Sequence, residues 1–299
     1  MDNANEPAVD LHHRPPAVIH VDLDGLTDIY FAHGWKYSHT DDSIFETGLK
    51  NILALLERNG VRATFFVIAS SLDNPRKREL VQEAVRRGHE IASHSLTHPP
   101  RLKSLDRERK SSEIGDSRQK LEEILGLKVR GFRAPGYEID RACIELLMQY
   151  GYEYDSSAFP TASFARRLDT SVAKLAGSRR PFPGTSLIEL PLPDYRPLPF
   201  PFNPSYSLLF GPSYFQLGLK RFLRSGAPLV LLFHLIDVAD PIAPDRLKGL
   251  TRRLFTLSIL SGQRKLERCQ KMLDLVRQHY TLTTTPCLLE EQNLRQEVH

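Results

Sequence analysis

Two short motifs supply the side chains that a hydrolytic metal site requires. Asp22-Leu23-Asp24 ends an apolar run, and His94-Ser-Leu-Thr-His98-Pro99 lies further along the chain. Alternate residues of a strand point to the same side, so both aspartates can face one cavity. Two imidazoles and one carboxylate would give a metal ion three protein ligands and leave a position for water, while the second carboxylate could move a proton. The pattern predicts hydrolysis of an amide or ester bond.

Each motif also has a purely structural explanation. Histidines four residues apart, here His94 and His98, would share one face of a helical turn, and most such pairs are structural. An aspartate at the end of a buried strand often caps the next helix. Both motifs follow predicted strands, however, and burying two carboxylates together is costly unless a cation lies between them or one holds a proton. We therefore expect a metal.

A third motif, Arg133-Ala-Pro135-Gly136-Tyr137, also follows a predicted strand. An arginine there can hold a carboxylate through a two-pronged hydrogen bond, and Asp22 is the obvious partner. The turn would expose the backbone N–H of Gly136 or Tyr137, which could stabilise an oxyanion together with the metal. The alternative is an ordinary turn with an exposed arginine.

His234 ends the most apolar strand of the chain, residues 229–233. A histidine in this position is often a hydrogen-bonded core residue. Its place at the strand end makes it the best candidate for the acid that protonates a departing amine, since imidazole titrates near neutral pH. Asp155 or Asp237 could orient it. His20, which alternates with the two aspartates, is interpreted as structural.

Short apolar runs alternate with amphipathic stretches, a pattern typical of a parallel sheet covered by helices. We predict seven strands, at 18–23, 63–69, 90–94, 131–134, 152–156, 187–191 and 229–234, and a last extended run at 280–285. Helices are expected at 44–59, 75–87, 104–125, 139–150 and 263–278, with Gly60, Gly88, Gly126 and Gly151 as C-terminal caps. The candidate residues fall at strand ends, where parallel α/β proteins build their sites, so we expect one α/β barrel.

Length and composition agree with one barrel domain. The chain has 299 residues, 41% of them hydrophobic. Its net charge of +4 is far from the concentrated basic face of a nucleic-acid binder. Three cysteines without CxxC spacing predict no disulfide framework. No secretory signal and no membrane-spanning run is seen, so a cytoplasmic protein is expected.

We expect flexible tails at 1–15 and 291–299 around a single domain at 16–290, which carries insertions at about 181–212 and 237–260. The first insertion is rich in proline and should be mostly an extended loop. Its apolar side chains could form a surface for an acyl or polyprenyl chain or a membrane edge, or could simply pack under their own loop. They are Phe182, Leu198, Phe200, Phe202, Tyr206, Leu208, Leu209 and Phe210.

The ordered motifs DLDG (22–25), HSLTHP (94–99), RAPGY (133–137), YDSS (154–157) and LLFH (231–234) resemble those of the polysaccharide deacetylase, or NodB-homology, family of carbohydrate esterases. The resemblance implies a distorted (β/α)7-type barrel of parallel strands with helices outside. It also implies a metal on Asp24, His94 and His98, with Asp22 as base, Arg133 holding that base and His234 as acid. The DxD spacing is similar to the branch with peptidoglycan deacetylases and the deformylase acting on lipid-linked aminoarabinose.

The expected activity is metal-dependent removal of an acetyl or formyl group from the nitrogen of an amino sugar, in a glycan or a lipid-linked glycan precursor. The ligands suit zinc, and cobalt, nickel or iron could occupy the same geometry. Peripheral contact with the inner membrane face is an expected extension, and no nucleic-acid partner is expected. Two alternatives stay open: an amidohydrolase acting on a small non-sugar compound, and a non-catalytic glycan-binding relative.

Overall fold

The computed structural model describes residues 14–36, 42–170, 185–194, 202–243, 247 and 249–290. The C-terminal tail expected at 291–299 and most of the N-terminal tail expected at 1–15 lie outside these residues. So do Phe182, Leu198 and Phe200 of the predicted apolar cluster.

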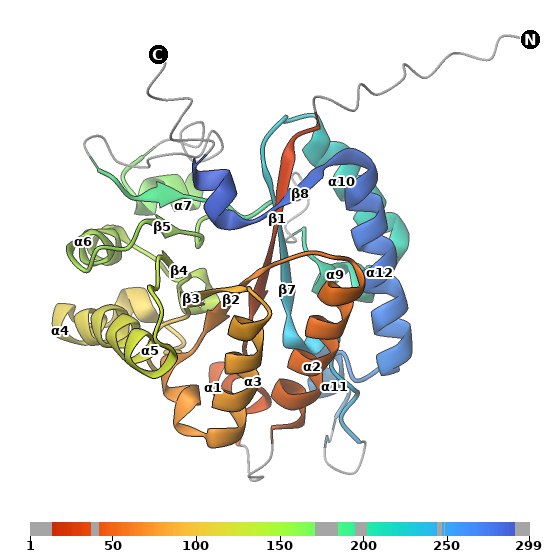
Figure 1. Cartoon of the computed structure of the whole chain (residues 1–299), viewed down its shortest axis with the longest axis horizontal. Coiled ribbons are helices and arrows are strands. Elements are labelled where there is room, and N and C mark those ends of the chain that lie inside the picture. Colours follow the sequence, from red (N-terminus) through yellow and green to blue (C-terminus); the bar gives the residue numbers. More distant parts are fainter. Residues whose placement is uncertain are drawn as a thin grey trace, which may run out of the picture.

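The described strands form one parallel sheet that curls into a half-barrel (Figure 1). Its order is β6-β5-β4-β3-β2-β1-β7. The remaining strand, β8, pairs with residues 16–18 of β1, which come before the residues of β1 that pair with β2. The strands are β1 (Pro16–Asp22), β2 (Thr64–Val67), β3 (Glu90–Ser93), β4 (Gly131–Phe132), β5 (Tyr154–Asp155), β6 (Ile188–Glu189), β7 (Leu229–His234) and β8 (Thr281–Thr283). Each predicted strand is confirmed, and the half-barrel of parallel strands with helices outside is consistent with the expected distorted (β/α)7-type barrel.

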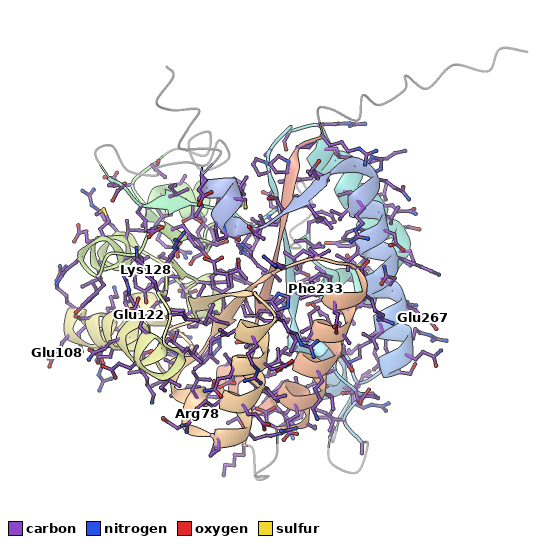
Figure 2. All side chains as sticks on the ribbon, in the orientation of Figure 1. Arg78, Glu108, Glu122, Lys128, Phe233 and Glu267 are labelled. Atoms are coloured by element: carbon purple, nitrogen blue, oxygen red, sulfur yellow. The ribbon has the colours of Figure 1, made fainter. Side chains whose placement is uncertain are left out.

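Helices surround the strands on several sides, with α4, α5 and α6 at one flank and α10 and α12 at the other (Figure 1). The described helices are α1 (Leu26–Ala32), α2 (Ser43–Arg58), α3 (Pro75–Arg86), α4 (Arg107–Ser111), α5 (Ser117–Leu125), α6 (Arg141–Gln149), α7 (Ala162–Arg167), α9 (Pro204–Phe210), α10 (Pro212–Leu223), α11 (Leu250–Phe255) and α12 (Gly262–His279). Charged side chains such as Glu108 and Glu267 lie at the rim, whereas Phe233 lies inside (Figure 2). No described helix has the length and apolar character needed to cross a membrane.

The helix ends follow the predicted caps. Gly60, Gly88, Gly126 and Gly151 all have positive φ angles between 60° and 77°, which glycine adopts without the steric cost of a side chain. At the start of α3, the Asn74 side chain accepts hydrogen bonds from two backbone amides. These caps confirm where four predicted helices end.

Strand alternation separates two apolar cores. In β1, Ala17, Ile19 and Val21 face the surrounding helices, whereas Val18 belongs to a second cluster inside the half-barrel. His20 and Asp22 share the inward side of β1 with Val18, because side chains two apart point the same way. Leu288 and Leu289, from the end of the described chain, also pack in the inner cluster. The inward row therefore carries polar groups toward one end of the barrel.

The proline-rich insertion, predicted to be mostly an extended loop, contains a helix that the sequence analysis did not predict. Within its described part, α9 begins at Pro204 and is followed directly by α10, which begins at Pro212. Proline at the first helical position costs nothing, because that N–H has no intrahelical partner, and Asn203 caps α9 through the amide of Tyr206. The prolines start helices here rather than breaking them.

The helix expected at 104–125 is interrupted. A π-helical turn, Ser112–Asp116, lies between α4 and α5. Such turns insert one extra residue and often occur next to functional sites. All three cysteines are free, as expected, with Cys143 and Cys269 buried and Cys287 exposed.

Candidate metal and catalytic centre

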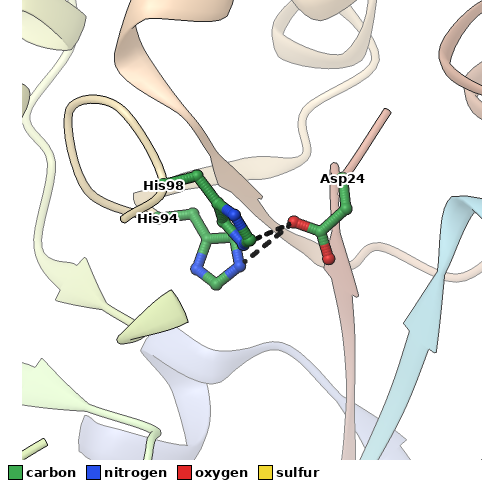
Figure 3. A group of neighbouring side chains, drawn as sticks. All are labelled: Asp24, His94 and His98. Carbon is green, nitrogen blue, oxygen red and sulfur yellow. Dashed lines mark ion pairs between the residues drawn. The ribbon is translucent and has the colours of Figure 1, made fainter. Parts of the chain in front are cut away.

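Asp24, His94 and His98 converge at the carboxyl end of the sheet (Figure 3). Asp24 Oδ1 lies 3.3 Å from His94 Nε2 and 3.1 Å from His98 Nε2. Both imidazoles are buried, and the Asp24 carboxylate is mostly so. Burial alone would raise the pKa of Asp24, but the adjacent His98 and His94 hold that pKa well below its usual range.

The hydrogen bonds of His94 show that this cluster fits a metal. His94 Nδ1 lies 2.8 Å from the backbone carbonyl of Arg133, and a carbonyl only accepts, so Nδ1 carries the proton. In the neutral ring, Nε2 then points a lone pair at the Asp24 carboxylate. Two facing acceptors require a proton or a cation between them. One carboxylate and two imidazoles are a donor set that suits zinc and similar divalent ions.

The charge around His94 acts in the same sense. Burial lowers the pKa of this imidazole, but the carboxylates of Asp22 and Asp24 outweigh that effect and raise it above its ordinary value. The negative potential that favours a proton on His94 would equally favour a cation at this position.

The segment that carries the two histidines is a loop, not the helical turn expected from their spacing. Ser95 and His98 have positive φ angles of 68° and 58°. The loop is held by Glu113, from the π-helical turn, whose Oε2 accepts the amides of Leu96 (3.0 Å) and Thr97 (2.8 Å). The Thr97 hydroxyl donates to the other carboxylate oxygen. Glu113 was not singled out in the sequence. The i, i+4 spacing of the histidines suggested a helical turn because spacing alone does not show that a distant side chain holds the segment as a loop.

Asp22 lies at the end of β1 with 1% of its surface exposed, and Arg133 is fully buried beside it. Arg133 Nη1 donates to Asp22 Oδ1 at 2.7 Å, which brings together the two predicted partners. The contact has one prong rather than two, because Nη2 donates instead to His20 Nδ1 (2.7 Å) and Ser156 Oγ (2.8 Å). Arg133 Nε donates to the Ser156 carbonyl, so this arginine is fixed on several sides.

The register of the sheet places His234 opposite Asp22, on the neighbouring strand β7. His234 Nε2 lies 3.8 Å from Asp22 Oδ2 and 3.2 Å from the Tyr137 hydroxyl. With about a fifth of its side chain exposed, His234 can be reached from the cavity. The proposed acid and base thus face one another across the site.

Asp237 and Ser205 hold the other side of His234. Asp237 Oδ2 accepts the His234 backbone amide at 2.8 Å, and the Ser205 hydroxyl donates to Asp237 Oδ1 at 2.6 Å. Ser205 Oγ can then accept from His234 Nδ1, 3.2 Å away. Burial raises the pKa of Asp237, although His234 partly opposes the shift. Ser205 was missed because it lies in the segment read as an extended loop.

Asp155, the other carboxylate predicted to orient His234, has different partners. It accepts hydrogen bonds from the Ser157 amide and hydroxyl, and Ser157 Oγ in turn accepts the amide of Ala134. Burial, followed by its own interaction with Asp155, raises the pKa of the neighbouring Glu189 well above its usual range. These contacts make Asp155 a support of the turn after Arg133, whereas Asp237 is the carboxylate beside His234.

The turn after Arg133 restricts the oxyanion prediction to one amide. The Tyr137 N–H donates to the Ala134 carbonyl at 2.9 Å, which removes this amide from the predicted pair. Gly136 has a φ of 56° and lines the site cavity, while Pro135 is buried at the start of the turn. The Tyr137 ring also lines the cavity, and burial raises the pKa of its hydroxyl well above the usual value.

The site opens into a cavity of about 270 Å³. Its lining is Asp22, Asp24, Ile29, Ala32, His33, His94, His98, Pro100, Gly136, Tyr137 and His234. Tyr137 and His234 also line an adjoining cavity of about 360 Å³, which we call the apolar groove. The remaining lining of the apolar groove is Asn203, Ser205, Tyr206, Leu209, Ile236, Leu254, Phe255 and Leu257.

Comparison with known proteins gives one family match, to polysaccharide deacetylase over residues 34–154. A peptidoglycan deacetylase of Helicobacter pylori is 26% identical over 141 residues, 46% of this chain and 47% of that protein. A chitooligosaccharide deacetylase of Bradyrhizobium is 43% identical over 78 residues, 26% of this chain and 32% of that protein. The matched stretches thus span less than half of these relatives.

Solved structures agree over nearly the whole fold. A putative polysaccharide deacetylase from Mycobacterium smegmatis superposes with a TM-score of 0.63 at 20% identity, covering 97% of this chain and 94% of that one. An allantoinase, Puue, superposes with a TM-score of 0.59 at 16% identity, covering 92% and 89%. At these identities, the likeness shows a shared fold.

Proposed function

We propose that this chain, a member of the polysaccharide deacetylase family, is a metal-dependent hydrolase that removes an acetyl or formyl group from the nitrogen of an amino sugar. The observation that carries the proposal is the convergence on one cavity of a three-ligand cluster, a buried arginine-held carboxylate and an imidazole. A binding protein would need neither the spare carboxylate nor the imidazole, so this set argues against a non-catalytic glycan-binding relative.

The proposed mechanism assigns each group one task. Asp24, His94 and His98 would hold the divalent metal, with zinc as the favoured ion, and the bound ion would supply Lewis-acid polarisation of the amide and of water. Asp22 takes a proton from the attacking water, whose oxygen forms the new bond to the acyl carbon.

The remaining groups complete the reaction. The Gly136 amide faces the developing oxyanion, and Arg133 keeps the base in place. His234 gives its Nε2 proton to the sugar nitrogen as the C–N bond breaks, so that a carboxylic acid and a free amine result. The Tyr137 hydroxyl and Ser205 hold the imidazole in the orientation that this transfer requires.

The test is release of acetate or formate by the purified protein loaded with zinc, measured on N-acetyl and N-formyl amino sugars. Turnover that chelation abolishes and added divalent metal restores is the expected result. Absence of released acid from every sugar amide, in protein that binds one metal per chain, would contradict the proposed reaction.

An amidohydrolase acting on a small non-sugar compound is the second candidate. The observation that favours it is the fold shared with an allantoinase, a protein whose name states a non-sugar substrate. A parallel screen of non-sugar amides and ureides separates the two candidates, because the same catalytic groups would serve both but only one substrate class would be turned over.

The finer proposal is that the amino sugar is attached to a lipid. Its support is the apolar groove, which joins the site cavity through Tyr137 and His234. The helices α9 and α11 both contribute to its lining, and they also carry Phe210, Leu250 and Phe255, each at least half exposed. Such a surface next to a site suits an acyl or polyprenyl chain and contact with a membrane face. The same amino sugar should be turned over faster with an apolar tail than without one.

A further inference from the structure

Behind Arg133, away from the site cavity, a chain of buried hydrogen bonds runs into the barrel. Arg133 Nη2 donates to His20 Nδ1 at 2.7 Å. A guanidinium has only donors, so His20 Nδ1 must be the acceptor, and the ring proton must be on Nε2. His20 is 0% exposed. Burial, and secondly the adjacent Arg133, holds the pKa of His20 well below its usual range, so the ring stays neutral.

The same direction continues beyond His20. His20 Nε2 lies 3.0 Å from Thr285 Oγ1, to which it donates. Thr285 Oγ1 lies 2.7 Å from Thr64 Oγ1, and the Thr64 hydroxyl donates to Glu90 Oε2 at 2.6 Å. Since the only Thr64 proton is engaged with Glu90, its oxygen accepts from Thr285. Every proton in the chain therefore points from Arg133 toward Glu90.

The chain is built by distant parts of the sequence. His20 is on β1, Thr64 is on β2, and Thr285 follows β8 near the end of the described residues. Thr64 and Thr285 are each 1% exposed. Phe66 packs against both the His20 ring, 5.0 Å away, and the Arg133 guanidinium, 4.0 Å from its ring centre. These residues are shielded from bulk solvent, so each hydrogen bond constrains the next.

We infer that His20 and Thr285 are positioning residues for Asp22: they fix the guanidinium of Arg133, which in turn fixes the carboxylate. The inference rests on the proposed function only for its kinetic test. Its structural part concerns the Nε2–H tautomer of His20. Displacement of a reacting group by about 1 Å can cost on the order of 100-fold in rate.

The first test compares two substitutions at one position. His20→Asn keeps an acceptor near the place of Nδ1, whereas His20→Leu removes it. We expect His20→Leu to lower kcat on the order of 100-fold with KM and zinc affinity little changed, and His20→Asn to restore most of that loss. Wild-type kcat in His20→Leu, or an equal loss in both variants, would overturn the inference.

The second test uses Thr285, where Thr285→Ser keeps the hydroxyl and Thr285→Val keeps the shape. The valine variant should lower kcat while the serine variant does not. Independently, ¹⁵N NMR of the wild-type protein, with the His20 signals assigned from the His20→Asn variant, should show the Nε2–H tautomer. An Nδ1–H tautomer overturns the inference even if no substrate is ever turned over, which separates it from failure of the proposed reaction.

Discussion

Two aspartates separated by one residue meet very different surroundings. Asp22 is buried against Arg133, whereas Asp24 faces two imidazole nitrogens at 3.1 and 3.3 Å. The difference follows from position, because Asp22 ends β1 and Asp24 lies in the segment between β1 and α1. Identical side chains can thus serve as base and as metal ligand.

This contrast predicts opposite phenotypes for two matched substitutions. Asp22→Asn should retain zinc and lose turnover by about 100- to 10,000-fold, the usual contribution of a general base. Asp24→Asn should lose zinc affinity first, because it weakens a ligand. Calorimetric zinc titration and acid release would be measured on both proteins. Loss of zinc by Asp22→Asn with normal binding by Asp24→Asn would exchange the two roles.

Glu90 accepts the last hydrogen bond of the series that starts at Arg133, and we expect it to make the free energy of unfolding depend on pH. Burial raises the pKa of Glu90 from 4.5 to about 7. Because the folded state holds this proton more tightly, the resulting stability is complete below about pH 4.5 and is lost as pH rises through 7. The wild type should lose about 3 kcal/mol between pH 4 and 8, at 1.36 kcal/mol per pKa unit, relative to Glu90→Gln.

Denaturant unfolding at several pH values measures this difference. Glu123→Gln, which changes an exposed glutamate of α5, is the matched control and should follow the wild type at each pH. Parallel curves for the wild type and Glu90→Gln would show that Glu90 titrates normally in the folded protein.

Residue types at strand ends and the pairing of Arg133 with Asp22 could be predicted from the sequence, but the other hydrogen-bond partners of these residues could not. The positions of Asp22, Asp24, Arg133 and His234 followed from strand periodicity alone. His20 was interpreted as structural because the sequence does not show that Arg133 would donate a hydrogen bond to it through Nη2. Which group donates and which accepts in each hydrogen bond is known only once the structure shows the groups in contact.

Among the elements, the π-helical turn between α4 and α5 is the one that shapes the site. It presents Glu113 to the loop that carries His98. The positive φ angle of His98 costs on the order of 1–3 kcal/mol, and such a conformation persists only where neighbouring contacts hold it. The hydrophobic pattern of a helix continues through such a turn, so the sequence predicted one uninterrupted helix. At α9 and α10 the error was the reverse: their prolines predicted an extended loop, although Pro204 and Pro212 begin helices.

The Glu113 anchor predicts an effect on metal binding from outside the ligand set. Glu113→Ala should lower zinc affinity about 10- to 100-fold, as loss of a supporting partner of a metal ligand commonly does. Glu113→Gln keeps an acceptor for the two loop amides and should lose less. Competition with a zinc chelator measures both affinities. Unchanged affinity in Glu113→Ala would show that the loop holds its conformation without this carboxylate.

At the scale of the whole molecule, the polar site cavity and the apolar groove adjoin one another. His234 and Tyr137 belong to the lining of both cavities, and α11 adds Arg252 and Arg253 beside its exposed apolar residues. In the proposed lipid contact, the apolar side chains would enter the acyl boundary of a membrane and nearby basic groups would meet anionic headgroups. The chemistry would then be presented to a sugar at the membrane surface.

This arrangement predicts that the apolar surface can be weakened without harming the chemistry. Leu209 and Leu254 line the apolar groove at 38% and 37% exposure, and Leu217, at 59% on α10, lines a different cavity. Leu209→Ser with Leu254→Ser should raise KM for an amino sugar carrying an apolar tail, and reduce sedimentation with anionic liposomes, on the order of tenfold from about 1 to 2 kcal/mol of lost apolar contact. Turnover of the tail-free sugar and the Leu217→Ser control should stay at wild-type levels. Equal loss in the control, or wild-type liposome binding by the double variant, would place the lipid contact elsewhere on the molecule.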